Sequence, residues 1–334
     1  MIIRLPVSKS IANRLLILQA MHNMPLTDVY GQDIPDDVKL MHNAIRSIHS
    51  GAKRIDLQNC GTAMRFLTAY CAQREGHTII LDGSERMRQR PVRQLVNALR
   101  TCGADVTYLS TEGFPPLQIT GKHLNHALPV SVSADISTQF ASALLLIGMD
   151  VTCNSTSPYI AMTRDIISRW QAGDRNYMER DWSAAAFWYE YVALHGTEIF
   201  LTGLHADDIQ GDKVVLDIFS HLGVTTTFET DGVRLTKTNS PAMNDFSVSF
   251  KNCPDLYPAV AVTCRRLGIR LHASGTDALP YKESNRLIAV QQMKTYSDHR
   301  IAMALLAAGL PCDDIACINK SYPAFYEQLC QLQS

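Results

Sequence analysis

The sequence predicts an α/β fold of two domains built from repeated units, and three observations support this prediction. First, the chain has 334 residues, and a domain usually holds roughly 100 to 200 residues. Second, hydrophobic residues make up 46% and charged residues 19% of the chain, as in globular proteins that fold throughout. Third, one pattern recurs along the chain: an amphipathic helix closed by glycine, then a strand, a turn and a second strand.

The recurring pattern is nearly complete in two places. One copy predicts a helix over residues 92–99 that closes at Gly103, then strands in ADVTYLS and PPLQITG around a turn at residues 112–113. The other predicts a helix over residues 214–222 that closes at Gly223, then strands in VTTTFET and VRLTK around a turn at residues 231–232. Because the two glycines lie 120 residues apart, the sequence favours a duplicated architecture over a single wound sheet.

Three other helices lack the two-strand ribbon. They are predicted around residues 39–47, 163–170 and 283–293, and each leads almost directly into the next element. The polar segment GDRNYMERD has no apolar periodicity and marks a join near residues 175–180. We expect one lobe over residues 9–178 and a second over residues 1–8 plus 179–334. The alternative is one large α/β domain with irregular insertions.

Charge and hydropathy exclude several classes of function. Lys and Arg number 31 against 32 Asp and Glu, so no basic field exists to attract nucleic acid or an anionic membrane. No apolar run is long enough for a signal peptide or a membrane span, and we expect a soluble, cytoplasmic protein. The nine cysteines form no CxxC motif, which predicts reduced core residues rather than disulfides or a metal site.

Two basic clusters have the chemistry to hold a small anion. The segment VSKSIANR places Lys9, Ser10 and Arg14 at the start of an apolar helix, where free N–H groups and the helix dipole favour negative charge. A serine cap beside a solvated lysine is the alternative. In ERMRQRPVR, Pro91 suits a first helical turn and predicts that Arg90 caps that helix, although a charge run is usually a solvated face.

Two further clusters combine polar and charged residues. Ser137, Thr138 and Gln139 precede a strongly apolar helix, as anion ligands or as ordinary caps. In YKESNR, Glu283 and Arg286 are three residues apart, which predicts a carboxylate beside a guanidinium on one helical face. The same cluster comprises Asp255, Lys282, Asp298, His299, Arg300 and Lys320, and so joins carboxylates able to transfer protons with several cations.

Ten motifs in this order resemble the 5-enolpyruvylshikimate-3-phosphate (EPSP) synthase family over nearly the whole chain. They are VSKSIANR, NCGTAMR, ERMRQRPV, STQF, SPYI, QGD, PDLYPAVAV, YKESNRL, YSDHRIAMA and NKSYPAFYEQL. The resemblance implies two domains of βαβαββ units in an inside-out α/β barrel, the enolpyruvyl transferase fold. It implies transfer of the enolpyruvyl group of phosphoenolpyruvate to the 5-hydroxyl of shikimate 3-phosphate, by a monomer with no metal or organic cofactor.

The resemblance also implies which residues bind each substrate. The positions that match shikimate 3-phosphate ligands are Lys9, Ser10, Arg14, Ser137, Thr138, Gln139, Tyr159, Asp255 and Lys282. The positions that match phosphoenolpyruvate ligands are Lys9, Gly61, Thr62, Arg90, Gln139, Arg286, Arg300 and Lys320. Glu283 matches the proton donor to the methylene carbon, and Asp255, with Lys9 nearby, matches the group that takes the hydroxyl proton.

The chain departs from the family pattern at several positions. In the family motif NAGTAMRP, Ala and Pro are replaced by Cys60 and Phe66. In the segment around KES, Arg and Asp are replaced by Pro280 and Asn285. In GDWS, Gly is replaced by Arg180. The usual N-terminal strand is expected to be missing, and the three clipped ribbons make the chain short. Gly61 keeps the glycine that favours inhibition by glyphosate, although Phe66 nearby leaves that sensitivity open.

Two rival functions share this set of residues. A catalytically weak or inactive paralogue would bind shikimate 3-phosphate or a related anion without turnover, and the shortened scaffold favours it slightly. The sister enolpyruvyl transferase that acts on a UDP-sugar should carry a reactive cysteine on a loop near the cations. The loop ERMRQRP has no cysteine, which disfavours this second rival.

Overall fold

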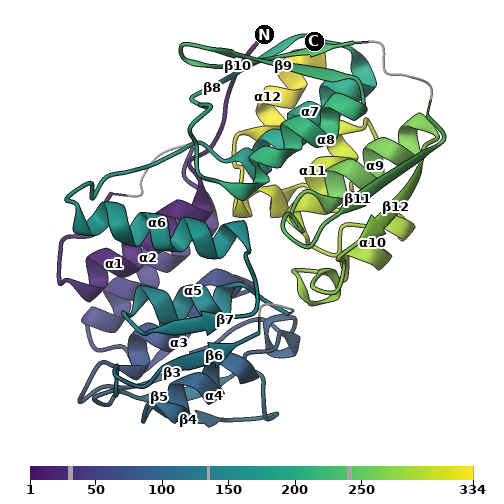
Figure 1. The fold of residues 1–334 in the computed structure, drawn as a ribbon. Coiled ribbons are helices and arrows are strands. Elements are labelled where there is room, and N and C mark those ends of the chain that lie inside the picture. Colours follow the sequence, from purple (N-terminus) through teal and green to yellow (C-terminus); the bar gives the residue numbers. More distant parts are fainter. Residues whose placement is uncertain (29–32, 134–135, 239–242, 334) are drawn as a thin grey trace. The chain divides into compact units, whose positions relative to one another are not determined.

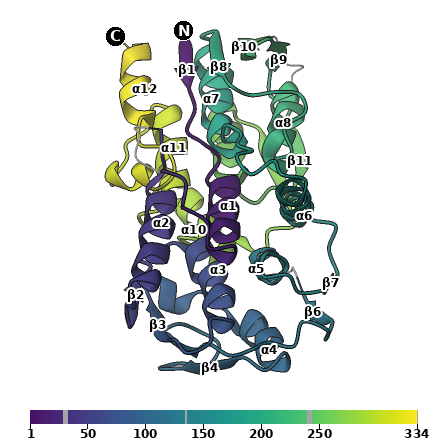
Figure 2. The ribbon, with the colours of Figure 1, turned by 90° about the vertical axis from the view of Figure 1, so that its left-hand side faces the viewer.

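The computed structural model describes residues 1–28, 33–133, 136–238 and 243–333 (Figures 1 and 2). The chain forms two compact units. Unit 1 comprises Met1–Lys9, Gly31–Asp36 and Met178–Ser334, and unit 2 comprises Ser10–Tyr30 and Asp37–Tyr177. Lys9, the described residues 33–36 and Met178 lie inside the expected first lobe but group with unit 1. None of the helices in the described residues is long and apolar enough to cross a membrane.

Unit 2 contains one complete βαβαββ repeat and two reduced ones. The complete repeat is β2 (Arg54–Asp56), α3 (Gly61–Ala72), β3 (Thr78–Asp82), α4 (Arg93–Thr101), β4 (Asp105–Tyr108) and β5 (Leu117–Thr120), with a 3-10 turn at Met87–Gln89. The second repeat keeps β6 (Val130–Val132), α5 (Gln139–Leu146), β7 (Val151–Cys153) and α6 (Pro158–Gln171). The third keeps α1 (Lys9–Met21) and α2 (Asp36–His49), whose first residues belong to unit 1.

Unit 1 repeats the same plan. Its complete repeat is β1 (Ile2–Arg4), α7 (Trp182–His195), β8 (Ile199–Thr202), α8 (Val215–His221), β9 (Val224–Glu229) and β10 (Gly232–Lys237). Its second repeat keeps β11 (Asp245–Ser249), α9 (Tyr257–Leu267), β12 (Arg270–Ser274) and α10 (Arg286–Gln292). Its third keeps α11 (His299–Ala307) and α12 (Phe325–Gln333), and short 3-10 turns occur at Gly211–Val214, Leu279–Tyr281 and Ala316–Lys320.

The sheets of the two units match in order and direction. The four-stranded sheets run β2-β3-β5-β4 and β1-β8-β10-β9. In each, the first two strands are parallel, with Ile55 opposite Leu81 and Ile3 opposite Leu201, and the remaining neighbours are antiparallel. The pairs β6–β7 and β11–β12 are parallel, and Figure 1 shows β11 and β12 beside α9.

One helix of each repeat is buried nearly all round. In unit 1, α7, α9 and α11 pack against one another. In unit 2, the residues of α1 from Ile11 to Ala20 are buried, and α3 packs against α5. Outer helices such as α4 bury one face only, through Leu95, Val96, Ala98 and Leu99. Helices inside and strands outside make the inside-out arrangement that the enolpyruvyl transferase fold predicts.

The structure confirms the predicted ribbons and corrects the prediction for the N-terminus. Strands β4 and β5 follow Gly103, and β9 and β10 follow Gly223. No ribbon follows α2, α6 or α10, because the described residues 50–53, 172–181 and 293–298 contain no named strand. The expectation of a missing N-terminal strand was wrong: β1 pairs in parallel with β8, as Figure 2 shows, since three alternating residues suffice for this edge.

Candidate active site

A carboxylate in unit 1, Asp255, forms ion pairs with three cations. Its Oδ1 lies 3.2 Å from Lys282 Nζ and 2.8 Å from Arg286 Nη1, and its Oδ2 lies 2.9 Å from Arg300 Nη2. Asp255 lies in the turn before α9, and the three cations follow it by 27 to 45 positions in the sequence. Burial acts to raise the pKa of Asp255, but Arg300, Lys282 and Arg286 outweigh burial and hold it well below the usual range.

Arg286 is the most heavily engaged cation of this group. Besides Asp255, its Nη2 lies 3.0 Å from Glu283 Oε2 and its Nε lies 2.9 Å from Asp298 Oδ2. Its side chain is only 1% exposed, so burial alone would lower its pKa, yet Asp298, Asp255 and Glu283 raise it. A guanidinium shared among three carboxylates stays charged and fixes their relative positions.

Glu283 lies beside two cations, as the sequence predicted for one of them. Its Oε2 meets Arg286, and its Oε1 lies 3.5 Å from Lys320 Nζ. The predicted helical face was wrong, because α10 begins at Arg286 and Glu283 precedes it. Asn285 is the N-cap that fixes where α10 begins, since its side chain accepts from the backbone N–H of Ile288.

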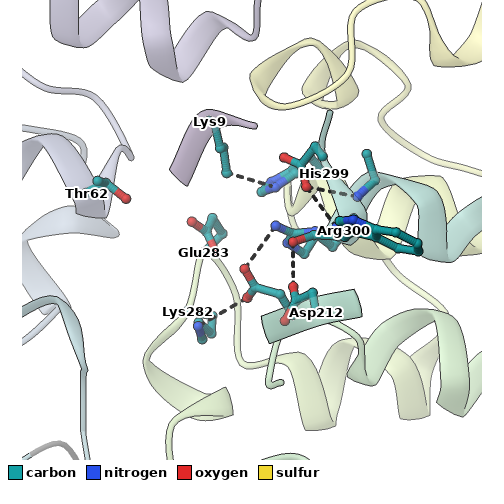
Figure 3. A network of polar contacts seen from close by, with 12 residues as sticks. Lys9, Thr62, Asp212, Lys282, Glu283, His299 and Arg300 are labelled. Atoms are coloured by element: carbon teal, nitrogen blue, oxygen red, sulfur yellow. Dashed lines mark hydrogen bonds and ion pairs between the residues drawn. The ribbon is translucent and has the colours of Figure 1, made fainter. Parts of the chain in front are cut away.

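Lys9 and His299 meet in the same unit (Figure 3). Lys9 Nζ lies 3.4 Å from His299 Nε2. His299 is fully buried, and burial, Lys9 and Arg300 together hold its pKa well below the usual range. The imidazole is therefore neutral near pH 7, with Nε2 accepting from the lysine ammonium. Asp298 caps α11 by accepting from the backbone N–H of Arg300, which fixes His299 and Arg300 in the first helical turn.

Arg14 is the most buried predicted ligand in unit 2. Its Nε donates to Thr163 Oγ1 at 2.8 Å, its Nη1 to the Ser10 carbonyl at 2.7 Å and its Nη2 to Ser142 Oγ at 3.2 Å. The guanidinium also lies over the ring of Phe66, 5.4 Å from its centroid. Burial lowers the pKa of Arg14 to about 10, so the group remains a cation at neutral pH among uncharged partners.

Gly61 brings two more arginines of unit 2 together. A Cβ on Gly61 would lie 2.4 Å from Arg65 Nη1 and 2.5 Å from Arg90 Nη2, so glycine leaves room for both guanidinium groups at the start of α3. Arg90 Nη1 donates to the Asn59 carbonyl at 3.1 Å. The prediction that Arg90 caps a helix was wrong: α4 begins at Arg93, and the chain is extended at Arg90.

The remaining predicted ligands of unit 2 surround the start of α5 and α6. Gln139 Nε2 donates to Thr62 Oγ1 at 3.0 Å, which links α5 to α3. Ser137 Oγ accepts from the Gln139 backbone N–H, whereas Thr138 stands at the N-cap without a side-chain cap bond. Tyr159 lies in the first turn of α6. Ser137 therefore satisfies a backbone N–H at the start of α5, as the alternative interpretation of ordinary caps held, whereas the Thr138 hydroxyl does not act as a cap.

The structure collects the predicted residues into two groups, one in each unit. The group in unit 1 contains Lys9, Asp255, Lys282, Glu283, Arg286, Arg300 and Lys320. The group in unit 2 contains Ser10, Arg14, Gly61, Thr62, Arg90, Ser137, Thr138, Gln139 and Tyr159. Eight of these sixteen members stand in the first turn of a helix, where the dipole end favours anions: Lys9, Ser10, Gly61, Thr62, Gln139, Tyr159, Arg286 and Arg300.

Sequence reasoning missed two residues that hold Arg14 in place. Ser142 lies in the apolar helix α5 and Thr163 lies on the buried face of α6. The two hydroxyls hydrogen-bond to each other at 2.9 Å as well as to Arg14. The sequence signal for Ser142 was a hydroxyl residue within an otherwise apolar helix, which needs a buried hydrogen-bond partner. Within the described parts of the chain, no group of three or more His, Cys, Asp or Glu side chains is placed to hold a metal ion.

Comparison with known proteins gives the same family over most of the chain. The family model described as EPSP synthase (3-phosphoshikimate 1-carboxyvinyltransferase) matches residues 45–173, 170–294 and 288–329. A 3-phosphoshikimate 1-carboxyvinyltransferase of Bacteroides fragilis is 34% identical, and the alignment covers 98% of this chain and 94% of the relative. A protein of the same name from Colwellia psychrerythraea is 27% identical, with 98% and 96% covered.

A solved structure shares the fold. EPSP synthase from Acinetobacter baumannii superposes with a TM-score of 0.67 at 18% identity, covering 99% of this chain and 95% of that chain. The alignment with the Bacteroides fragilis protein runs over 398 positions, against 334 residues here, so at least 64 positions have no counterpart in this chain. The shortening is thus internal, which agrees with the missing ribbons.

Proposed function

The chain belongs to the EPSP synthase family, and on this premise we propose that it transfers the enolpyruvyl group of phosphoenolpyruvate to the 5-hydroxyl of shikimate 3-phosphate. The products are EPSP and phosphate. The observation that carries the proposal is the cluster in unit 1, where two carboxylates, Asp255 and Glu283, share buried cations. Such a cluster combines proton transfer with stabilisation of a polyanion.

Glu283 is the proposed acid. It gives a proton to the methylene carbon of phosphoenolpyruvate, and positive character develops at the adjacent carbon. The substrate hydroxyl adds to that carbon and yields a tetrahedral ketal phosphate. In the second step the phosphate leaves with the electrons of its C–O bond, and the new methyl group loses a proton, which restores the double bond. Arg286 and Lys320 flank Glu283 at 3.0 and 3.5 Å and would face the departing phosphate.

Asp255 is the proposed partner of the attacking hydroxyl. With its pKa held well below the usual range, it is ionised at neutral pH and accepts a hydrogen bond from a hydroxyl, although it is a weak base while three cations contact it. An incoming anion that draws Arg286 or Arg300 toward itself would raise the basicity of Asp255. Substrate binding and activation of the base would thereby be coupled.

The proposed ligands of each substrate are those that the family resemblance implies, and each set draws on both groups. Shikimate 3-phosphate would take the group in unit 2 that includes Ser10, Arg14, residues 137–139 and Tyr159, together with Lys9, Asp255 and Lys282. Phosphoenolpyruvate would take Lys9, Arg286, Arg300 and Lys320 of unit 1 with Gly61, Thr62, Arg90 and Gln139. The supporting observation is that Arg14 is a buried cation held by hydroxyls and carbonyls. A monomeric, cytoplasmic enzyme acting on small molecules is part of the same proposal.

The test is phosphate release by the purified full-length chain with phosphoenolpyruvate, with and without shikimate 3-phosphate. We expect release that depends on shikimate 3-phosphate. Glu283→Gln is the matched control, because it keeps the shape of the site and removes the acid. Absence of release, combined with a raised melting temperature on adding shikimate 3-phosphate, would favour the inactive paralogue instead; the named relatives give that alternative no support.

A further inference from the structure

The segment that carries Lys9 is held by hydrogen bonds from two distant parts of unit 1. Strand β1 ends at Arg4, and residues 5–8 then lead to Lys9 without a sheet partner. The backbone N–H of Val7 donates to the Asp33 carbonyl at 3.2 Å, and that of Ser8 donates to the Glu179 carbonyl at 2.8 Å. A single antiparallel bridge joins Val7 to Arg180. The position of Lys9 therefore depends on residues 33 and 179–180.

Arg180 joins all three of these segments through one guanidinium nitrogen. Its Nη1 donates to the Leu5 carbonyl at 3.0 Å and to Asp33 Oδ2 at 2.7 Å. The second cation on the same Asp33 oxygen, Arg4 at 3.1 Å, is 67% exposed, whereas Arg180 is 24% exposed. Because exposed pairs are screened by water, the Arg180 contact is the stronger of the two.

The three joined segments all adjoin points where the chain passes between units. The chain leaves unit 1 after Lys9 and after Asp36, and it returns to unit 1 at Met178. Arg180 therefore acts within unit 1 close in sequence to Met178, and its partners Leu5 and Asp33 lie close in sequence to Lys9 and Asp36. A small shift of this contact would move the backbone of Lys9 relative to the rest of unit 1.

The fold leaves specific room for the Arg180 side chain. Gly203 has a φ of +75°, and a Cβ there would lie 2.8 Å from Arg180 Cγ. The stem of Arg180 thus lies over a glycine, and any larger residue at 203 would both be strained and push the stem away. Arg180 also replaces the glycine that the family motif GDWS carries, so this contact distinguishes the chain from that pattern.

We propose that Arg180 is a positioning residue that sets where Lys9 lies against His299. The inference rests on the proposed function, in which Lys9 binds phosphoenolpyruvate. His299 is fully buried in the first turn of α11 and cannot follow a displaced lysine. The 3.4 Å contact between Lys9 Nζ and His299 Nε2, drawn in Figure 3, is therefore a direct reporter of the position of Lys9.

The first arm of the test uses no activity. The ring nitrogen resonances of His299 are recorded by NMR in the wild type and in Lys9→Met, which defines the signal of the lost contact; His299→Gln assigns the peaks. Arg180→Met should shift the His299 signals toward those of Lys9→Met, and Arg180→Lys should shift them less. Arg234→Met is the matched control, because Arg234 is another ion-paired arginine of unit 1, bound to Glu229 and Glu198, and should leave His299 unchanged.

The second arm measures steady-state kinetics. Displacing a substrate-binding group by about 1 Å can cost up to about 100-fold in rate. We expect Arg180→Met to lower kcat/KM for phosphoenolpyruvate about 10- to 100-fold, mainly through KM, while Arg234→Met matches the wild type. Asp33→Asn should weaken the same contact, and the double variant should lose less than the sum of the two single variants.

The outcomes separate the inference from the proposed function. An inactive wild type would refute the proposed function, while the His299 spectra would still decide whether Arg180 places Lys9. An unchanged His299 signal in Arg180→Met, where Lys9→Met shifts it, would overturn the inference whatever the melting temperature does. If Arg180→Met does not fold, Asp33→Asn is used in both experiments. It should likewise shift the His299 signals toward those of Lys9→Met and lower kcat/KM for phosphoenolpyruvate.

Discussion

The two units share one plan of helices and strands but treat buried charge in different ways. Each has one complete βαβαββ repeat, one repeat without its ribbon and one reduced to helices in the described residues. In unit 1, Arg286 contacts Asp255, Glu283 and Asp298. In unit 2, Arg14 contacts hydroxyls, carbonyls and an aromatic ring.

This difference assigns different chemistry to two similar scaffolds. A cation among uncharged acceptors keeps its attraction for a ligand anion, because no neighbouring carboxylate competes for it. A cation among carboxylates holds them in place, and under the proposed function it would release them for proton transfer when an anion arrives. The repeat supplies helix N-termini in both units. Under the proposed function, the side chains near those N-termini would let both units bind anions, and the proton-transferring carboxylates would lie in unit 1.

The largest effect is expected from removing the acid in unit 1. Glu283→Gln should lower kcat about 100- to 10,000-fold, because general acid catalysis contributes about that much and the amide cannot supply the proton. The affinity for both substrates should change little, since the amide retains the shape of the side chain. Single-turnover rates and equilibrium binding measure the two quantities separately. A loss of binding with little change in rate would contradict the role of Glu283 as acid.

The next effect compares one buried arginine from each unit. Arg286→Met should lower the free energy of unfolding by about 3–5 kcal/mol, because three carboxylates lose their shared cation. Arg14→Met should cost about 1–3 kcal/mol, because it leaves only uncharged partners. Urea unfolding at neutral pH measures both. Equal losses would mean that the two units hold their cations in the same way.

A buried acid in unit 1 predicts a dependence of stability on pH. Glu190 lies in α7, fully buried, and its carboxylate oxygens have no hydrogen-bond partner. Burial raises its pKa well above the usual 4.5, so its contribution to stability is fully present below about pH 4.5 and is lost as pH rises toward the raised pKa.

Glu190→Gln should remove this dependence. The stability of the variant relative to the wild type should therefore grow with pH, by up to about 1.4 kcal/mol per pH unit. Urea unfolding of both proteins at pH 5, 6, 7 and 8 measures the difference. A constant difference across that range would show that Glu190 ionises without cost in the folded protein.

The smallest effect is expected at Gly61 in unit 2. In Gly61→Ala the new methyl group would meet the ends of Arg65 and Arg90, which can swing aside, so the fold should survive with an unchanged melting temperature. The displaced guanidinium groups should raise KM for phosphoenolpyruvate about tenfold, or roughly 1.4 kcal/mol. Steady-state kinetics with glyphosate as competitor measures both affinities. An unchanged KM would show that Arg90 does not bind this substrate.

The sequence was sufficient where local signals act alone. The two complete ribbons, the three clipped ones and the pairing of Glu283 with Arg286 depend on glycine turns, alternation and a three-residue spacing, and the structure shows all of them. The starts of α10 and α4 were misplaced because competing local signals decided them. Asn285 capped one helix two residues past Glu283, and α4 began after Pro91 rather than at it.

The contacts that the sequence could not reveal join distant segments. Arg14 meets Ser142 and Thr163, more than 120 residues away, and Arg286 meets Asp298 across a loop. Arg180 reaches Asp33 over 147 positions. No period or spacing records such pairs, because tertiary packing alone brings them together. For such distant pairs the sequence offered only motifs shared with a family, which identify some of their members, such as Arg14 and Arg286, as candidate site residues.

The reduced repeats show which part of the βαβαββ unit is dispensable. In both units the buried helix of every repeat is retained, and the loss falls on outer strands, so the helix starts that carry candidate site residues are kept. The two-stranded ribbon is therefore dispensable, whereas the buried helices of the interior are kept. For protein engineering, this makes the chain a natural starting point for a smaller catalyst, in which further trimming would begin at the two-stranded pairs β6–β7 and β11–β12.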